Sequence, residues 1–242
     1  MLIVGLDAAT KWRKFGYALG RVSQGVVEVF SAGTLQSESS KDELSRIIVP
    51  ELQNASRALV AIDAPLGWPA AAGATFAQHS AGQGIGVDKD GLFHRATDDF
   101  VRSKIGKRPL EVGANLIART AHSALSVLHA LREKTGLAIP LAWTPTFEGV
   151  AAIEVYPAAS LKAWGCAHAK YSDNPNARRQ IAAKLRGRIK GIEKRAIDPA
   201  DAFDAALCLL AALDFLEGEA WSPEDSKRAM KEGWIWMRRS NA

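Results

Sequence analysis

The pattern of hydrophobic and polar positions in the first quarter of the chain predicts strands, then a helix, then another strand. Apolar or alternating runs at residues 2–7, 15–21 and 25–32 indicate strands. The second and third are separated by Ser23-Gln24-Gly25, which is short enough for a hairpin turn. Residues 43–55 place apolar side chains at the spacing of a helix, and residues 58–63 are almost wholly apolar. This order predicts three strands in a meander, a helix and a strand buried on both faces.

The remainder of the chain predicts more helix than strand. Helices are expected at 70–80, 114–134, about 175–190 and 199–217, with strands at 150–155 and 234–237. Leu116, Ile117, Leu125, Leu128 and Leu131 form the expected apolar side of the long helix. The glycine-rich stretch 82–91 predicts a flap-like loop. Since no repeat or linker stands out, we expect one α/β domain over residues 1–242, with a helical and loop insertion at about 70–148.

Composition and charge narrow the class of protein only modestly. The 242 residues are 48% hydrophobic and 24% charged, which is ordinary for a globular protein. No apolar run reaches a membrane span and no signal-peptide pattern opens the chain, so we expect a cytoplasmic protein that does not enter membranes. The two cysteines and five histidines lack metal-ligand spacing, which disfavours a zinc site. A formal net charge of +5 weakly favours polyanionic partners.

Four aspartates carry the strongest chemical signal in the chain. Asp7 ends the first predicted strand, and Asp63 ends the apolar strand at 58–63. If these strands are parallel neighbours, both carboxylates lie at the same edge of the sheet. Asp201 and Asp204 stand three residues apart and so share one face of a helix. Oxygen ligands of this kind suit Mg²⁺ or Mn²⁺, and two such ions support phosphodiester cleavage.

Three of the four aspartates also have a simpler interpretation that the sequence leaves open. Asp7 could hydrogen-bond the turn that follows it, and Asp63 could cap the turn at Ala64-Pro65. Asp201 falls in the first turn of a helix that begins near Pro199, where an acidic side chain is favourable in any case. Asp204 lies further into that helix, which makes it the better candidate ligand.

Four short segments resemble an uncharacterised family described as predicted RNase H-like nucleases (domain of unknown function 429). They are Gly5-Leu6-Asp7-Ala8-Ala9, Ile62-Asp63-Ala64-Pro65-Leu66-Gly67, Glu154-Val155-Tyr156-Pro157 and Asp201-Ala202-Phe203-Asp204-Ala205. The resemblance implies a ribonuclease H-like mixed sheet, with three antiparallel strands followed by parallel strands and flanking helices. The arrangement of acidic residues is also similar to that of RuvC-type resolvases. This similarity implies that Asp7, Asp63, Asp201 and Asp204 are catalytic and metal-binding residues.

Further residues are candidates for contact with substrate. Arg95 could grip a phosphate, with Asp98 nearby, but the same segment also fits the start of a helix. Glu154 near a strand end could assist the site or pair with a basic neighbour. The basic tract 177–195 includes Arg186 and Lys190, whose side chains could follow a phosphate backbone or simply form a solvated helix face.

Together these observations predict a nuclease that uses two Mg²⁺ or Mn²⁺ ions to hydrolyse phosphodiester bonds. Nucleic acid is the expected partner, and the sequence does not distinguish DNA from RNA. Two alternatives stay open because one fold hosts many chemistries. The chain could be a catalytically silent module that binds nucleic acid or another ligand, or it could be an ATP-dependent phosphotransferase, although it lacks a recognisable phosphate loop.

Overall fold

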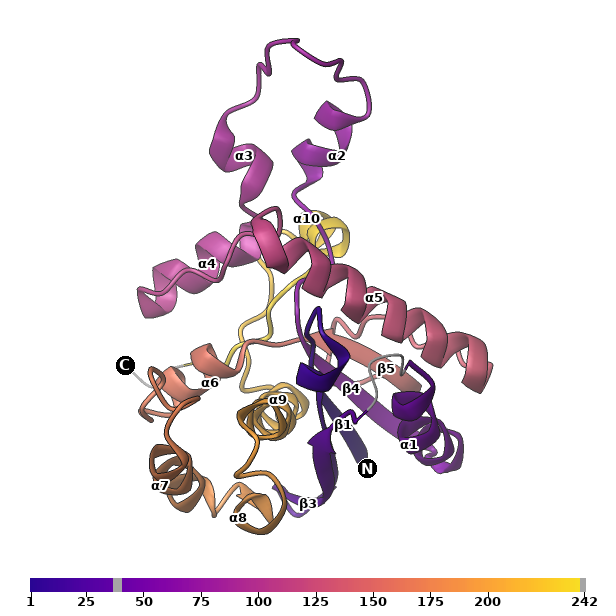
Figure 1. The fold of residues 1–242 in the computed structure, drawn as a ribbon, viewed down its shortest axis with the longest axis vertical. Helices are drawn as coiled ribbons and strands as arrows, with labels where there is room; N and C mark the ends of the chain where they lie inside the picture. Colours follow the sequence, from indigo (N-terminus) through magenta and orange to yellow (C-terminus); the bar gives the residue numbers. More distant parts are fainter. Residues whose placement is uncertain (37–40, 240–242) are drawn as a thin grey trace.

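The computed structural model describes residues 1–36 and 41–239, which form a mixed sheet with helices on both faces (Figure 1). The strand order in this six-stranded sheet is β5-β4-β1-β2-β3-β6. The strands are β1 (Leu2–Asp7), β2 (Gly16–Ser23), β3 (Val26–Thr34), β4 (Arg57–Asp63), β5 (Gly149–Glu154) and β6 (Ile189–Lys190). β1, β2 and β3 are antiparallel, whereas β4 and β5 run parallel to β1. This topology confirms the predicted ribonuclease H-like mixed sheet.

The strands that carry the candidate acids are apolar because both of their faces are covered. In β1, Leu2, Val4 and Leu6 pack into one hydrophobic core, and Ile3 packs into the other. Successive side chains of a strand point to opposite faces, so a strand between two helical layers needs apolar residues at every position. The acidic residues therefore appear only where the strands leave these cores.

The hairpin between β2 and β3 forms as the sequence predicts. Ser23 pairs with Val26, which leaves a two-residue turn of Gln24 and Gly25. Both turn residues have positive φ, 50° and 72°, as a tight hairpin turn of the type that matches strand twist requires. Each of the two strands begins one residue later and ends two residues later than predicted.

One face of the sheet is covered by α1 (Lys41–Asn54) and α5 (Asn115–Thr135) (Figure 1). Leu44, Ile48 and Leu52 of α1 pack in the same core as Leu128 and Leu131 of α5. The long helix predicted at 114–134 is therefore present. The prediction is wrong for Leu116, which is 54% exposed because it lies in the first turn of α5, beyond the sheet-covered part of the helix.

The other face is covered mainly by α9 (Ala200–Leu216), whose side chains from Ala202 to Phe215 are buried apart from Asp204. Around it lie α6 (Pro157–Ala163), α7 (Pro175–Leu185) and α8 (Ile192–Arg195). The helix predicted at 175–190 ends earlier than expected, since the chain turns after Leu185 to form β6. Across residues 1–36 and 41–239, none of the helices has the length and apolarity needed to cross a bilayer.

Between β4 and β5 the chain forms four helices, two of which project from the body of the protein at the top of Figure 1. The four helices are α2 (Ala70–Phe76), α3 (Lys89–Phe93), α4 (Ala96–Ile105) and α5, and the two that project are α2 and α3. The helix predicted at 70–80 is shorter than expected. The division into one domain with an insertion at about 70–148 stays a prediction.

The C-terminal region departs from the predicted strand at 234–237. After α10 (Ser226–Glu232), Ile235 makes only an isolated bridge to Glu154, and Arg238 makes another to Ala220. Trp234 and Trp236 are nevertheless buried, as are Ile235 and Met237. A short 3-10 turn, η1 (Trp12–Lys14), connects β1 to β2.

Candidate active site

Asp7 and Asp63 lie side by side at the carboxyl ends of β1 and β4. They are register partners in a parallel strand pair. In such a pair both strands end at the same edge of the sheet, which is where ligand sites of open α/β sheets form. Because both residues are only partly buried, their side chains reach the surface of a cleft at this edge.

Two strand glycines bring α9 and its acidic residues to the same edge. A Cβ on Gly5 would lie 2.1 Å from the carbonyl oxygen of Ala205, and a Cβ on Gly16 would lie 2.0 Å from that of Asp201. Only glycine therefore allows the α9 backbone to approach β1 and β2 so closely. Gly16 is also the register partner of Asp7, so the first turn of α9 lies beside the end of β1.

The cleft at this edge has a volume of about 260 Å³ and combines acidic with apolar walls. Asp7, Asp63 and Glu154 line it on the sheet side. Its apolar lining includes Pro65, Pro109, Leu110, Ile117 and Tyr156. A cleft of this kind, with a few convergent polar groups, is typical of a ligand-binding or active site.

The carboxylates at the cleft raise one another's pKa. Burial raises the pKa of Asp7 well above its usual range, and three neighbours raise it further: Asp63, Asp204 and Asp201. Burial likewise raises the pKa of Asp63, with additional contributions from the charges of Asp204 and Glu154. Lys107 opposes this effect on Asp63. Several carboxylates that share one site create a strong local demand for positive charge.

Asp204 is held in position by a tyrosine from a distant part of the chain. The hydroxyl of Tyr171 donates a hydrogen bond of 2.7 Å to Asp204 Oδ1. Burial raises the pKa of Asp204 to about 6, while the Tyr171 hydrogen bond lowers it. The backbone of Tyr171 is in turn fixed by the buried Arg178, whose guanidinium donates to the Tyr171 carbonyl oxygen at 3.0 Å.

Asp201 lies at the rim of the cluster and is more exposed. Its carboxylate is 3.8 Å from the ammonium group of Lys14. Burial raises the pKa of Asp201 and Lys14 lowers it. Asp201 is also in the first turn of α9, so its helix position is favourable without any ligand, as the simpler interpretation holds.

The chemistry of this donor set fits a hard divalent cation, although the side chains do not converge on one point. Within the described residues, no donor hydrogen-bonds the carboxylate of Asp7 or Asp63, and no group of three or more His, Cys, Asp or Glu side chains is arranged to hold a metal ion. Carboxylate oxygens are the ligands that Mg²⁺ and Mn²⁺ prefer. Binding by Asp7, Asp63 and Asp204 would therefore require their side chains to turn toward a shared position.

Arg95 and Glu154 are buried together beneath the cleft. Arg95 is 1% exposed, and all five N–H groups of its guanidinium have acceptors: both oxygens of Asp98, both of Glu154 and the carbonyl of Glu232. Burial lowers the pKa of Arg95, but the charges of Glu154 and Asp98 raise it more, so the net shift is upward. No guanidinium N–H of Arg95 is left for a phosphate oxygen, so this geometry opposes the predicted phosphate contact. It favours the alternative interpretation of Glu154, which is pairing with a basic neighbour.

Arg186 and Lys190 are not brought to the cleft. Arg186 follows α7 and donates two hydrogen bonds to Glu193. Lys190 is exposed on β6, which lies at the sheet edge beyond β3. Their predicted role in substrate binding would require a nucleic acid that spans from this edge to the cleft.

Several residues that shape the site carry no recognisable signal in the sequence. Tyr171 lies 33 residues from Asp204 in sequence, so only the fold shows their contact. Lys107 reaches Tyr156 as well as Asp63, with its ammonium 5.5 Å from the ring centre. Burial, assisted by the charge of Asp63, raises the pKa of Tyr156 to about 12. The position of Lys14 near the acids could have been predicted, because it lies in a basic turn shortly after the strand that ends at Asp7.

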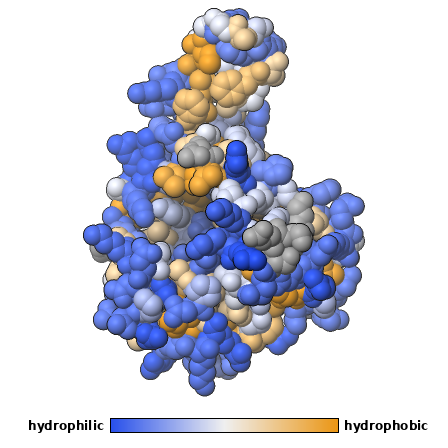
Figure 2. Space-filling view, in the orientation of Figure 1, coloured by the Kyte–Doolittle hydropathy of each residue, from blue (hydrophilic) through white to orange (hydrophobic). Residues whose placement is uncertain are grey.

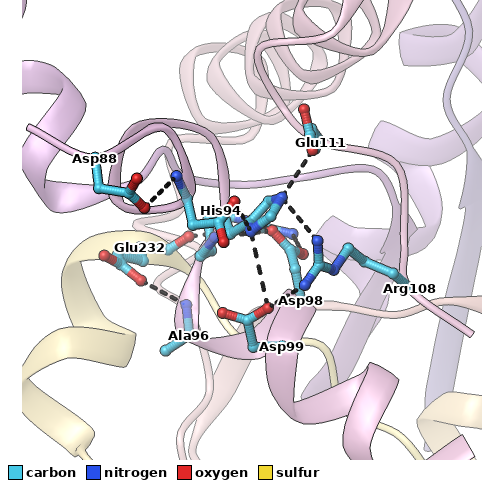
Figure 3. A network of polar contacts seen from close by, with 10 residues as sticks. Asp88, His94, Ala96, Asp98, Asp99, Arg108, Glu111 and Glu232 are labelled. Carbon is cyan, nitrogen blue, oxygen red and sulfur yellow. Dashed lines mark hydrogen bonds and ion pairs between the residues drawn. The ribbon is translucent and has the colours of Figure 1, made fainter. Parts of the chain in front are cut away.

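Figure 3 shows a second polar network, around His94. His94 Nε2 lies 2.7 Å from Glu111 and 2.9 Å from Arg108, and Arg108 also donates to Asp99. Glu232 accepts a hydrogen bond of 2.8 Å from the backbone N–H of Ala96. These contacts fix the start of α4 and the loop that follows it, and so support the cleft wall around Pro109 and Leu110.

Comparisons with known proteins show where the chain belongs. No curated protein matches it. Among solved structures, T. thermophilus RuvC in complex with Holliday junction substrate is similar, with 13% sequence identity, a TM-score of 0.38 and coverage of 90% of this chain and 96% of that chain. The family model described as "Protein of unknown function (DUF429)" matches residues 21–228, which include Asp63, Asp201 and Asp204. The chain therefore belongs to the DUF429 family of proteins of unknown function.

Proposed function

We propose that this protein is a nuclease that hydrolyses phosphodiester bonds in nucleic acid with Mg²⁺ or Mn²⁺. The observation that carries the proposal is the grouping of Asp7 and Asp63, which line the cleft at the ends of two parallel strands, with Asp204 of α9, whose charge raises the pKa of both. Such a cluster needs positive charge to remain ionised at neutral pH. Divalent cations provide that charge and bind phosphate oxygens as well.

The roles of the residues follow from their positions. Asp7 lies between Asp63 and the α9 acids, so it would contact both ions, with Asp63 and Asp204 completing their ligand sets and Asp201 assisting from the rim. Tyr171 would keep Asp204 oriented through its hydrogen bond. When bound, a pair of divalent ions activates a water as nucleophile and stabilises the leaving oxygen. No histidine base is therefore needed.

The proposal is tested with labelled substrates and an Asp7→Asn variant. Single-stranded, duplex and branched DNA and RNA would be incubated with Mg²⁺ or Mn²⁺. We expect Asp7→Asn to lower the cleavage rate at least about 100-fold. Residues that only hydrogen-bond a metal ligand typically cost roughly 10–100-fold when replaced, and loss of a ligand itself should cost at least as much. Asp173→Asn, which changes an exposed aspartate outside the cleft, is the matched control and should cleave at the wild-type rate.

Metal binding provides a second readout that does not depend on the substrate chosen. Calorimetry should show Mn²⁺ binding to the wild type and to Asp173→Asn, and a much weaker heat for Asp7→Asn. Full cleavage by Asp7→Asn would contradict the proposal. A protein with neither Mn²⁺ binding nor cleavage would instead fit a silent binding module.

A further inference from the structure

The connection between β1 and β2 carries a compact basic and aromatic turn at the edge of the acidic site. Its sequence is Lys11-Trp12-Arg13-Lys14, and residues 12–14 form η1. Asp7 and Gly16, at the two ends of the connection, are register partners. Both ends are therefore anchored beside the acidic cluster, and the turn must lie at the same edge of the sheet.

The cations of this turn face solvent next to an acid of the site. Lys11, Arg13 and Lys14 are all exposed. The side chain of Lys14 is 69% exposed, and its ammonium is 3.8 Å from Asp201. Contacts between exposed charges at this distance are weak, so Lys14 remains available for a stronger anion. A phosphate bound to Lys14 would therefore lie next to Asp201, at the rim of the proposed metal site.

Trp12, which follows Lys11 in the chain and is partly exposed, adds an aromatic side chain to this turn. Its ring stacks on the buried Phe15, with ring centres 5.6 Å apart and planes inclined by 25°. Residues 10–14 also line a groove of about 460 Å³, to which Trp12 contributes. Phe15 thus supports the indole ring at the groove. Cationic grooves with aromatic side chains are typical of sites for single-stranded nucleic acid, because an unpaired base has a free face for stacking.

The basic tract at 177–195 is less suited to the same task, since many of its cations already have partners. Arg178 is buried and holds the backbone of residues 171 and 172. Four more have partners: Arg179 bonds to Asn176, Lys184 to the carbonyl of Gly165, Arg186 to Glu193 and Arg188 to Glu217. The tract also lies on the β6 side of the sheet, away from the cleft.

We infer that the Lys11–Lys14 turn is a binding site for single-stranded nucleic acid. Lys11 and Lys14 contact backbone phosphates, and Trp12 stacks with an unpaired base. The bound nucleic-acid strand then passes from this groove to the acidic cleft. This inference rests on the proposed nuclease function and specifies its substrate as nucleic acid with an unpaired segment next to the cleaved bond.

The experiment measures binding of a fluorescein-labelled single-stranded oligonucleotide, and of the matching duplex, to the full chain in EDTA, where cleavage does not interfere. The double variant Lys11→Ala/Lys14→Ala is compared with Lys227→Ala/Lys231→Ala, which removes the same charge from exposed positions of α10. We expect the first pair to weaken binding at least tenfold and to lower the salt dependence by about two phosphate contacts. The second pair should bind like the wild type.

Trp12 tests the choice of single-stranded substrate. Trp12→Ala should weaken binding of the single strand by about tenfold and change duplex binding little, whereas Trp12→Phe should retain most of the affinity. Thermal melting of each variant confirms that the fold is intact. Unchanged single-strand binding in Trp12→Ala, or an equal loss in both lysine pairs, would overturn the inference while leaving the nuclease proposal standing. A wild-type protein that binds no nucleic acid would overturn both.

Discussion

At the scale of single residues, the aspartates of the acidic cluster are held at a cost to stability. Burial and neighbouring charges raise the pKa of Asp7, Asp63 and Asp204 above 3.8, the ordinary value for an aspartate. A carboxyl with a raised pKa in the folded state favours folding most when it is protonated. Its contribution is complete below the unfolded pKa and is lost as the pH rises through the folded pKa, which is about 6 for Asp204.

An Asp204→Asn substitution should therefore stabilise the protein without metal at about pH 8, by roughly 0.5–2 kcal/mol, and should have little effect at about pH 4. Asparagine keeps an oxygen that accepts the Tyr171 hydrogen bond, so the change removes charge and preserves shape. Urea denaturation of both proteins in EDTA across this pH range measures the difference. A variant that is equally destabilised at both pH values would show that Asp204 serves packing rather than charge.

Arg95 illustrates the opposite situation, a buried charge whose partners are complete. Arg95→Met should reduce the free energy of unfolding by about 3–5 kcal/mol, because it leaves the buried carboxylates of Glu154 and Asp98 without their cation. Arg95→Lys should also destabilise, since an ammonium has three donors where the guanidinium uses five. Unfolding in guanidinium chloride measures the stability of both variants, with Arg119→Lys on the exposed side of α5 as control. A wild-type unfolding free energy for Arg95→Met would contradict this account.

At the scale of elements, the position of α9 depends on the two glycines beneath it. Gly5→Ala should destabilise the protein by about 1–3 kcal/mol, because the new Cβ would lie 2.1 Å from a backbone oxygen of α9 that cannot move alone. The shift would also move Asp204 relative to Asp7, so activity should fall with stability. Gly73→Ala in α2 is the control. A Cβ there meets nothing within 4 Å, and alanine favours a helix by about 0.5–1 kcal/mol.

Thermal melting and cleavage assays of the two variants measure these effects. Equal melting temperatures for Gly5→Ala and the wild type would mean that α9 can slide on β1 at little cost. In that case, the close approach of helix and strand would not fix the acidic cluster.

The sequence predicted the elements best where their hydrophobic pattern was long or continuous. The apolar runs that end at Asp7 and Asp63 form strands, and the run around Asp204 forms α9. Helices of four to seven residues, such as α6, α8 and α10, were missed because such short segments show too little of a helical period. The Arg95–Glu154 and Tyr171–Asp204 contacts join residues 59 and 33 positions apart, and no local pattern encodes them.

At the scale of the whole molecule, the arm formed by α2, α3 and their connecting loop stands out from the body (Figure 1). Figure 2 shows hydrophobic side chains on its surface. The large exposed ones in and beside the arm are Trp68, Phe76, Ile85, Val87 and Phe93. Because few buried contacts hold the arm, its order depends on how its two ends are attached.

One carboxylate holds both ends. Glu232 Oε1 accepts from the N–H of Ala70, which begins α2, and Oε2 accepts from the N–H of Ala96, which follows α3. Arg228 pairs with the same group at 3.0 Å. Glu232 is 1% exposed, so water cannot replace these contacts without opening the base of the arm.

Glu232→Ala should therefore loosen the arm much more than the sheet. We expect amide hydrogen exchange in residues 70–76 and 89–96 to become at least about tenfold faster, equivalent to a loss of about 1.4 kcal/mol in local stability, because two backbone donors lose their acceptor. Peptides from β1 and β4 should exchange as in the wild type. Glu224→Ala, at an exposed position before α10, is the control and should leave the arm unchanged. If Glu232→Ala accelerated exchange equally in β1 and β4, the carboxylate would support the whole fold; unchanged exchange at 70–76 and 89–96 would mean that other contacts attach the arm.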